Sequence, residues 1–247
     1  MLEKVTLITK TEGLNQYKDR SLDEIVVGIA RVSSSRETNE LFDEAYKLIR
    51  HCILHQHWSV FEMANLTFEI KTSRAMGREL LRHGVMGIQE FSQRYAEVNS
   101  FESIEIRQQA KNNRQSSSEN INPVLETGIT AEDAVATTVA FSQETYKMLL
   151  NSGVARESAR LILPETATST LILNGRLREW ITFLNVRLHK TAQKEIREIA
   201  EAIRDEFIKE CPLIAKALFN FDNAYEVHII DRLVLEKYKV YHLIDKK

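Results

Sequence analysis

The chain has 247 residues, of which 43% are hydrophobic and 28% charged, with a formal net charge of −2. A chain of this length can bury a core without disulfides or metals, and its near-neutral charge excludes a general attraction to nucleic acid or anionic membranes. It shows no secretory signal pattern and no apolar run of about 18 residues, and its two cysteines lie far apart. We therefore expect one cytoplasmic domain over residues 1–247.

The first elements are indicated by alternation and by a helix start signal. Residues 3–9 alternate well enough to predict a strand, and Ser21 with Glu24 forms a capping box that predicts a helix through Val32. A second, amphipathic helix follows, with one apolar face formed by Leu41, Ala45, Leu48, Ile49, Cys52 and Ile53.

Three histidines at the end of this helix raise the question of a metal site. His51 and His55 have the i, i+4 spacing at which two imidazoles share an ion, and His57 follows closely. No carboxylate lies at the expected offset, and the His-Glu-x-x-His pattern is absent. We therefore expect no metal.

The clearest strand covers residues 65–71, where apolar and polar side chains alternate. It leads into a helix on which Arg74, Arg78 and Arg82 form one cationic stripe. That helix is predicted to end at His83, because Gly84 is the residue type that most often takes the left-handed conformation after a helix end.

Residues 89–95 are predicted to be extended. Alternation would then put two sets of side chains on opposite sides: Glu90, Ser92 and Arg94 on one, and Phe91, Gln93 and Tyr95 on the other. The first set suits a ligand with a phosphate and a polar ring, since arginine binds phosphate oxygens in a bidentate manner. The alternative is an ordinary edge strand beside a solvated helix face.

The second half of the chain predicts mainly helices. Residues 107–122 are almost free of apolar side chains and predict a polar surface loop. Thr130 with Asp133 starts a helix that Gly153 ends, and Arg156 and Arg160 then share a helical face before Pro164. A last apolar stripe is formed by Ile196, Ile199, Ala200, Ile203 and Phe207.

One stretch resembles the signature of flavin-dependent thymidylate synthases. It begins with Arg82-His83, has seven residues between Gly84 and Ser92, and ends with Arg94-Tyr95. The family signature has a third basic residue, arginine, where this chain has Gly84. The resemblance extends over residues 55–210, through His57 to Glu62, Val154 to Pro164 and residues 174–203.

This resemblance implies an α+β fold with a central, mainly antiparallel sheet and long helices. It implies a homotetramer with active sites between subunits, which converts deoxyuridylate (dUMP) to thymidylate (dTMP). Reduced FAD would supply the hydride, methylenetetrahydrofolate the carbon, and NADPH would reduce the flavin.

It also implies roles for individual residues. Arg187 and His57 would be catalytic, with Arg187 beside the uracil ring. The FAD contacts would be Ser59, Arg82, His83, Gly84, Glu90, Arg176, Arg178 and Thr182. The dUMP contacts would be Glu79, Arg82, Glu90, Phe91, Ser92, Gln93, Arg94, Arg160 and Arg187.

Several positions depart from the family pattern, and they leave two other functions open. The positions that differ from the residues common in relatives are Val60, Met63, Glu79, Arg176, Thr182 and Thr191. A carboxylate at Glu79 would repel a phosphate unless Arg82 or Arg78 neutralises it. One alternative is hydroxymethylation of dUMP on the same scaffold, and the other is a non-catalytic nucleotide-binding or assembly protein.

Neither Cys52 nor Cys211 has the surroundings of a thiolate nucleophile, which the non-flavin thymidylate synthases need.

Overall fold

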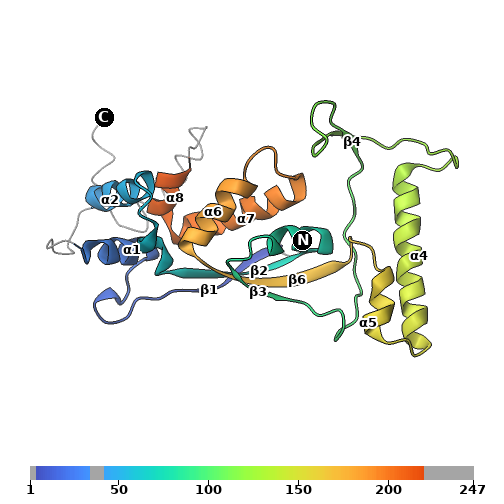
Figure 1. The fold of residues 1–247 in the computed structure, drawn as a ribbon, viewed down its shortest axis with the longest axis horizontal. Coiled ribbons are helices and arrows are strands. Elements are labelled where there is room, and N and C mark those ends of the chain that lie inside the picture. The colour runs from blue at the N-terminus through green and yellow to red at the C-terminus, as the bar shows by residue number, and fades with distance from the viewer. Residues whose placement is uncertain (1–3, 34–41, 220–247) are drawn as a thin grey trace. The chain divides into compact units, whose positions relative to one another are not determined.

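The computed structural model describes residues 4–33 and 42–219 (Figure 1). Its main sheet has the order β1-β2-β6-β3, with strands β1 (Val5–Lys10), β2 (Asn65–Ser73), β6 (Thr168–Arg176) and β3 (Gly87–Glu90). Strands β1 and β2 are antiparallel, since Lys71 N donates to Lys4 O at 2.8 Å and Thr11 N to Asn65 O at 3.0 Å. The predicted mixed fold with an antiparallel sheet is confirmed.

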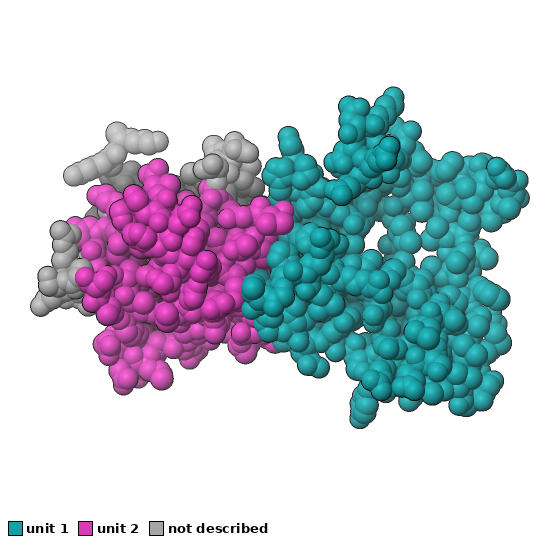
Figure 2. Space-filling view, viewed as in Figure 1, with its two compact units in different colours: residues 1–6, 69–173, 187–199 teal, residues 7–68, 174–186, 200–247 magenta. Residues whose placement is uncertain are grey.

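The chain divides into two compact units, shown in Figure 2. Unit 1 contains residues 1–6, 69–173 and 187–199, and unit 2 contains residues 7–68, 174–186 and 200–247. Strands β1, β2 and β6 contribute residues to both units. A single domain over residues 1–247 stays a prediction.

Unit 2 confirms the early helix predictions. Its first elements are η1 (Asn15–Tyr17), α1 (Leu22–Arg31), α2 (Phe42–Leu54) and η2 (Trp58–Glu62). Both hydrogen bonds of the Ser21–Glu24 capping box are present, and α1 ends at Arg31, one residue before the predicted end. On the predicted apolar face of α2, Ile49 and Cys52 are buried, whereas Leu41 lies outside the described residues.

The core of unit 2 forms around Trp180 of α6 (Leu177–Arg187). The Trp180 ring packs edge-to-face on Phe68, with centroids 4.9 Å apart, and on Phe183 at 5.8 Å. Its Nε1 donates to the Leu66 carbonyl at 3.0 Å, so the indole carries no unpaired polar group into the core. The long helix α7 (Lys194–Glu210) buries all five residues of its predicted stripe.

A buried carboxylate ties α1 to the last described helix, α8 (Pro212–Leu218). Asp23 is fully buried, and its two oxygens accept hydrogen bonds from Leu213 N at 2.9 Å and Ile214 N at 3.1 Å. These amides belong to the first turn of α8, where backbone donors have no partner within the helix. Asp23 therefore caps a helix that lies 190 residues away in sequence.

Unit 1 corrects the prediction of a loop at residues 107–122. Strands β4 (Arg107–Gln109) and β5 (Ser117–Asn120) form an antiparallel hairpin, in which Arg107 pairs with Asn120 and Gln109 with Ser117. The Gln109 side chain donates to the carbonyls of Asn113 and Ser116, at 3.1 and 2.9 Å. Local polar contacts thus replace the apolar alternation that normally indicates a strand.

The 21-residue helix α4 (Ala131–Asn151) is confirmed, with Thr130 as its N-cap and Gly153 at φ 82° after its end. Tyr146 is its one buried residue; the Tyr146 ring packs in a small cluster with Val98, Ala159 and Ala167. Phe141 and Met148, in contrast, are 68% and 51% exposed. In the described part of the chain, apolar side chains along this helix are therefore exposed.

Candidate functional site

Helix α3 (Arg74–Leu81) ends slightly earlier than predicted, with Arg82 as its C-cap. Gly84 does not take the left-handed conformation that is typical of a glycine after a helix end, because the positive-φ glycines among the described residues are Gly128 and Gly153. A Cβ added to Gly84 would meet no atom within 4 Å. This position therefore has both the backbone and the space for a side chain.

The arginine stripe of α3 is neutralised by carboxylates. Each guanidinium faces its own partner: Arg74 and Glu90 at 4.0 Å, Arg78 and Glu165 at 3.0 Å, and Arg82 and Glu79 at 3.3 Å. The Arg82 side chain is nevertheless 73% exposed. An exposed ion pair is worth only about 0–1 kcal/mol, so a stronger anion can compete for this guanidinium.

Each guanidinium nitrogen of Arg187, at the end of α6, has a partner. Its Nε donates to His83 Nε2 at 2.9 Å and its Nη2 to the Glu79 carbonyl at 3.1 Å, while Nη1 lies 2.9 Å from Glu79 Oε2. The side chain is only 14% exposed. The negative charge of Glu79 is thus balanced by Arg187 and Arg82, and Arg78 is not involved.

The surroundings of His83 favour its neutral form. Burial lowers the pKa of His83, and the positive charge of Arg187 lowers it further; Glu79 opposes the shift and Arg82 adds to it. A neutral imidazole leaves Nε2 free to accept the hydrogen bond from Arg187. Protonation would replace this acceptor by a donor and put two cations in contact.

We therefore expect His83 to make the protein lose stability in mild acid. Because the pKa of His83 is lower in the folded than in the unfolded state, its contribution is complete above about pH 6.5 and is lost as the pH falls from there through the folded-state value. Thermal unfolding between about pH 7.5 and about pH 5 should show a smaller loss of Tm for His83→Gln than for the wild type. The exposed His189, changed to Gln, serves as the control. Equal slopes for His83→Gln and wild type would contradict the expectation.

The extended conformation predicted for residues 89–95 holds only to Glu90, where β3 ends. The amides of Tyr95 and Ala96 both donate to the Ser92 carbonyl, at 3.0 and 2.9 Å, and this turn ends the alternation. Gln93 is consequently only 3% exposed and Tyr95 is 87% exposed, although both were predicted on one side. Phe91 packs against the cluster around Tyr146.

The side chains of Ser92 and Arg94 are exposed and line one hollow of about 340 Å³. Its other lining residues are Tyr95, Ala155, Arg156 and Glu157. Arg94 lies 3.3 Å from Glu157, which belongs to the short helix α5 (Arg156–Ala159). Residues from two of the motif segments therefore meet at this hollow.

Two further predicted dUMP contacts in unit 1 are Arg160 and Glu90. Arg160 begins η3 (Arg160–Ile162), so the helical face that it was predicted to share with Arg156 is broken by a change from α to 3-10 helix. Its Nε is buried and has no hydrogen-bond partner among the described residues. Glu90 accepts a hydrogen bond from Ser169 Oγ at 3.0 Å.

In unit 2, Glu62 joins the predicted FAD contacts that lie there. Its carboxylate pairs with Arg176, at 3.3 Å, and with Arg178. Arg176 also pairs with Glu179, and Thr182 Oγ1 donates to the Arg178 carbonyl at 3.0 Å. His57 and Ser59, at the start of η2, are exposed. No role was predicted for Glu62, although the segment from His57 that carries the resemblance ends with it.

The structure thus places the predicted residues in two groups. Unit 1 holds Glu79, Arg82, His83, Gly84, Glu90 to Arg94, Arg160 and Arg187, and unit 2 holds His57, Ser59, Arg176, Arg178 and Thr182.

Within residues 4–33 and 42–219, no three His, Cys, Asp or Glu side chains are grouped to hold a metal. The rings of His51 and His55 instead stack, with centroids 4.0 Å apart. No helix in the described part of the chain is long and apolar enough to cross a bilayer.

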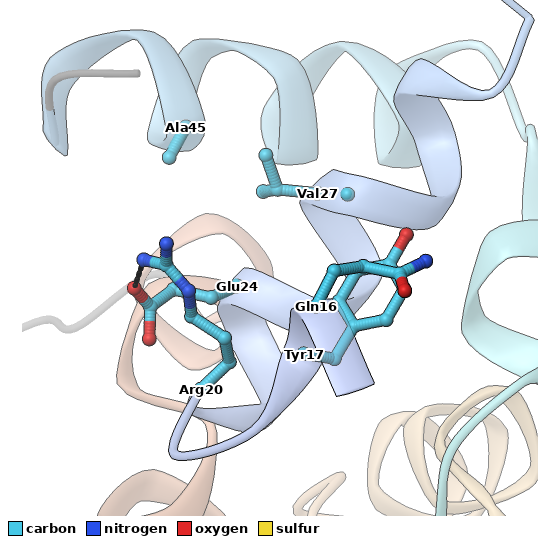
Figure 3. A pocket seen from close by; sticks show the side chains of 7 residues that line it. Gln16, Tyr17, Arg20, Glu24, Val27 and Ala45 are labelled. Atoms are coloured by element: carbon cyan, nitrogen blue, oxygen red, sulfur yellow. Dashed lines mark hydrogen bonds and ion pairs between the residues drawn. The ribbon is translucent and has the colours of Figure 1, made fainter. Parts of the chain in front are cut away.

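A separate pocket of about 100 Å³ lies between η1, α1 and α2 (Figure 3). Tyr17 closes it by lying against Gly28, where a Cβ would come within 2.5 Å of the ring. Arg20 and Glu24, which line it, pair with each other at 3.0 Å. None of the predicted site residues lines this pocket.

Comparison with known proteins identifies one family over most of the chain. The family profile described as "Thymidylate synthase complementing protein" matches residues 14–213. A probable flavin-dependent thymidylate synthase of Paramecium bursaria Chlorella virus 1 is 37% identical over 222 residues, which cover 88% of this chain and 99% of that protein. The flavin-dependent thymidylate synthase of Synechocystis sp. is 37% identical over 211 residues, covering 85% of this chain and 96% of that protein.

A solved structure is also similar. The UMP/dUMP methylase PolB from Streptomyces cacaoi, bound with 5-Br dUMP, aligns with a TM-score of 0.71 and 25% sequence identity. The alignment covers 86% of this chain and 93% of that chain.

Proposed function

The chain belongs to the flavin-dependent thymidylate synthase family, and on this premise we propose that it methylates dUMP to dTMP. The observation that carries the proposal is the hollow at which Ser92 and Arg94 of the signature meet Arg156 and Glu157. A nucleoside monophosphate carries about −1.5 to −2 charges, which the guanidinium groups of Arg94 and Arg160 can balance. The similarity to a dUMP methylase solved with a dUMP analogue supports the same substrate.

Arg187 is suited to act on the pyrimidine ring through its charge. Because Glu79 and His83 hold the guanidinium in place, it does not have to reorganise when negative charge develops on the ring. We assign it the catalytic role, with Ser92, Arg94 and Arg160 holding the phosphate. Glu79 and His83 would act by positioning Arg187.

The residues present fit a flavin. Within unit 1, the exposed Arg82 and the open backbone at Gly84 offer a cation and space to an anionic dinucleotide. Within unit 2, taken by itself, Arg178 and Ser59 offer a cation and a hydroxyl. When bound and reduced, FAD would supply the hydride that completes the methyl group. We assign methylenetetrahydrofolate as carbon donor and NADPH as reductant. A thiolate route has no support, because burial raises the pKa of the Cys52 thiol and Cys211 is also buried.

We also propose the homotetramer with sites between subunits. Helix α4 supports it, because covering an exposed apolar side chain such as Phe141 or Met148 with a second copy removes apolar surface from water, which is favourable. Light scattering should therefore give a mass four times that of the chain.

The test of the proposed function is an assay with dUMP, FAD, NADPH and methylenetetrahydrofolate labelled at the carbon that is transferred. Labelled dTMP is the expected product. Labelled hydroxymethyl-dUMP would assign the alternative chemistry. A protein that binds dUMP, takes up no FAD and so stays colourless, and forms no product would be a binding module. The enzyme proposal would then be wrong.

Gly84→Arg provides a separate test of the flavin contact at the end of α3. We expect tighter FAD binding without a loss of Tm, because the backbone there is not left-handed and a side chain meets open space. One added charge-assisted contact should tighten binding by about tenfold. FAD fluorescence and thermal unfolding measure the two effects, with Gly84→Ala as control. A destabilised variant with unchanged affinity would show that the glycine is needed by the backbone.

A further inference from the structure

The hollow beside Ser92 contains one carboxylate and two guanidinium groups. Arg94 pairs with Glu157 at 3.3 Å, and both side chains are largely exposed, 66% and 60%. Arg156, the neighbour of Glu157, lines the same hollow, and no described residue forms an ion pair with it. The hollow therefore has a net charge of +1 while Glu157 remains beside Arg94.

This arrangement is suited to an exchange of anions. An exposed pair between single charges is weak, whereas a phosphate offers more charge and more acceptor oxygens to the same guanidinium. A phosphate that arrives between Arg94 and Arg156 would pair with both. It would also repel Glu157, whose carboxylate has the same sign of charge.

We propose that Arg156 is a second phosphate-binding residue for the nucleotide, and that Glu157 is a resident counter-ion that holds Arg94 until the phosphate displaces it. This inference rests on the proposed function, since it takes dUMP as the ligand. It differs from the signature-based assignment, which places Ser92, Arg94 and Arg160 at the phosphate and gives no role to Arg156 or Glu157.

The two residues should have opposite effects on affinity. Arg156→Gln removes an attractive charge and should weaken dUMP binding by about tenfold. Glu157→Gln removes the competitor and should tighten dUMP binding by about threefold. Deoxyuridine has the same base and sugar without the phosphate, so its affinity should change in neither variant.

The experiment is titration calorimetry on the full-length protein with dUMP, deoxyuridine and inorganic phosphate, with Tm recorded for each variant. Two matched controls change exposed ion pairs elsewhere: Arg20→Gln, which breaks the pair with Glu24, and Glu165→Gln, which breaks the pair with Arg78. Neither control should alter the affinity for dUMP by more than about twofold.

The outcomes separate this inference from the proposed function. If the wild type binds dUMP but Arg156→Gln and Glu157→Gln bind it equally well, the inference is wrong and the function stands. Equal losses for dUMP and deoxyuridine in Arg156→Gln would also overturn it, because the effect would not depend on the phosphate. A wild type that binds neither dUMP nor inorganic phosphate would overturn both.

Discussion

Arg187→Ala is expected to lower kcat for dTMP formation by about 100-fold, with a much smaller change in the affinity for dUMP. The guanidinium is fixed by His83 and Glu79, so its charge is already placed when the ring becomes negative. Arg187→Lys should recover only part of the rate, because an ammonium lacks the fork that reaches both partners. Steady-state kinetics with dUMP, together with direct binding, separate the two quantities.

Arg160→Ala is the matched comparison for this prediction. Arg160 is assigned to the phosphate, so its loss should weaken dUMP binding by roughly 1.5–3 kcal/mol and leave kcat less affected. If the Arg187 and Arg160 variants lose only affinity, and by similar amounts, the catalytic role of Arg187 is wrong.

The largest effect on stability is expected for Asp23→Ala. The change leaves the amides of Leu213 and Ile214 buried without acceptors and removes two charge-assisted hydrogen bonds. We expect a loss of roughly 3 kcal/mol or more in the free energy of unfolding, and a fall in Tm of about 6–12 °C. Thermal and urea unfolding measure these quantities.

Two variants control for this expectation. Asp23→Asn keeps one acceptor oxygen and should lose less stability than Asp23→Ala. Asp133→Ala alters an exposed acidic residue in the first turn of α4 and should cost no more than about 1 kcal/mol. An Asp23→Ala protein with the Tm of the wild type would show that water replaces the carboxylate.

Local signals in the sequence predicted several elements well. The capping box of α1, the N-cap and terminal glycine of α4 and the apolar stripe of α7 depend on residues within a few positions of each other. The hairpin at residues 107–120 could not be predicted in this way. Its strands lack an apolar face, and Arg107 is held by a carboxylate of α7, Glu195, which lies 88 residues away.

The same distinction applies to the candidate site. Spacing alone indicated an arginine stripe, yet each of those guanidinium groups has its own carboxylate partner. The contact of Arg187 with His83 joins residues 104 positions apart, and no periodicity reveals it. The resemblance selected these residues, but it could not show that the turn at Ser92 buries Gln93 and exposes Tyr95.

The bond between Asp23 and the start of α8 also has a consequence during synthesis on the ribosome. The carboxylate is translated 190 residues before the first amide that it binds. At about 5–20 residues per second, α1 exists for roughly 10–40 s before its partner is made. During that interval the carboxylate lacks both of these amide donors, so the bond that joins α1 to the start of α8 is missing. The contact between α1 and α8 can therefore form only after residues 213 and 214 have been translated.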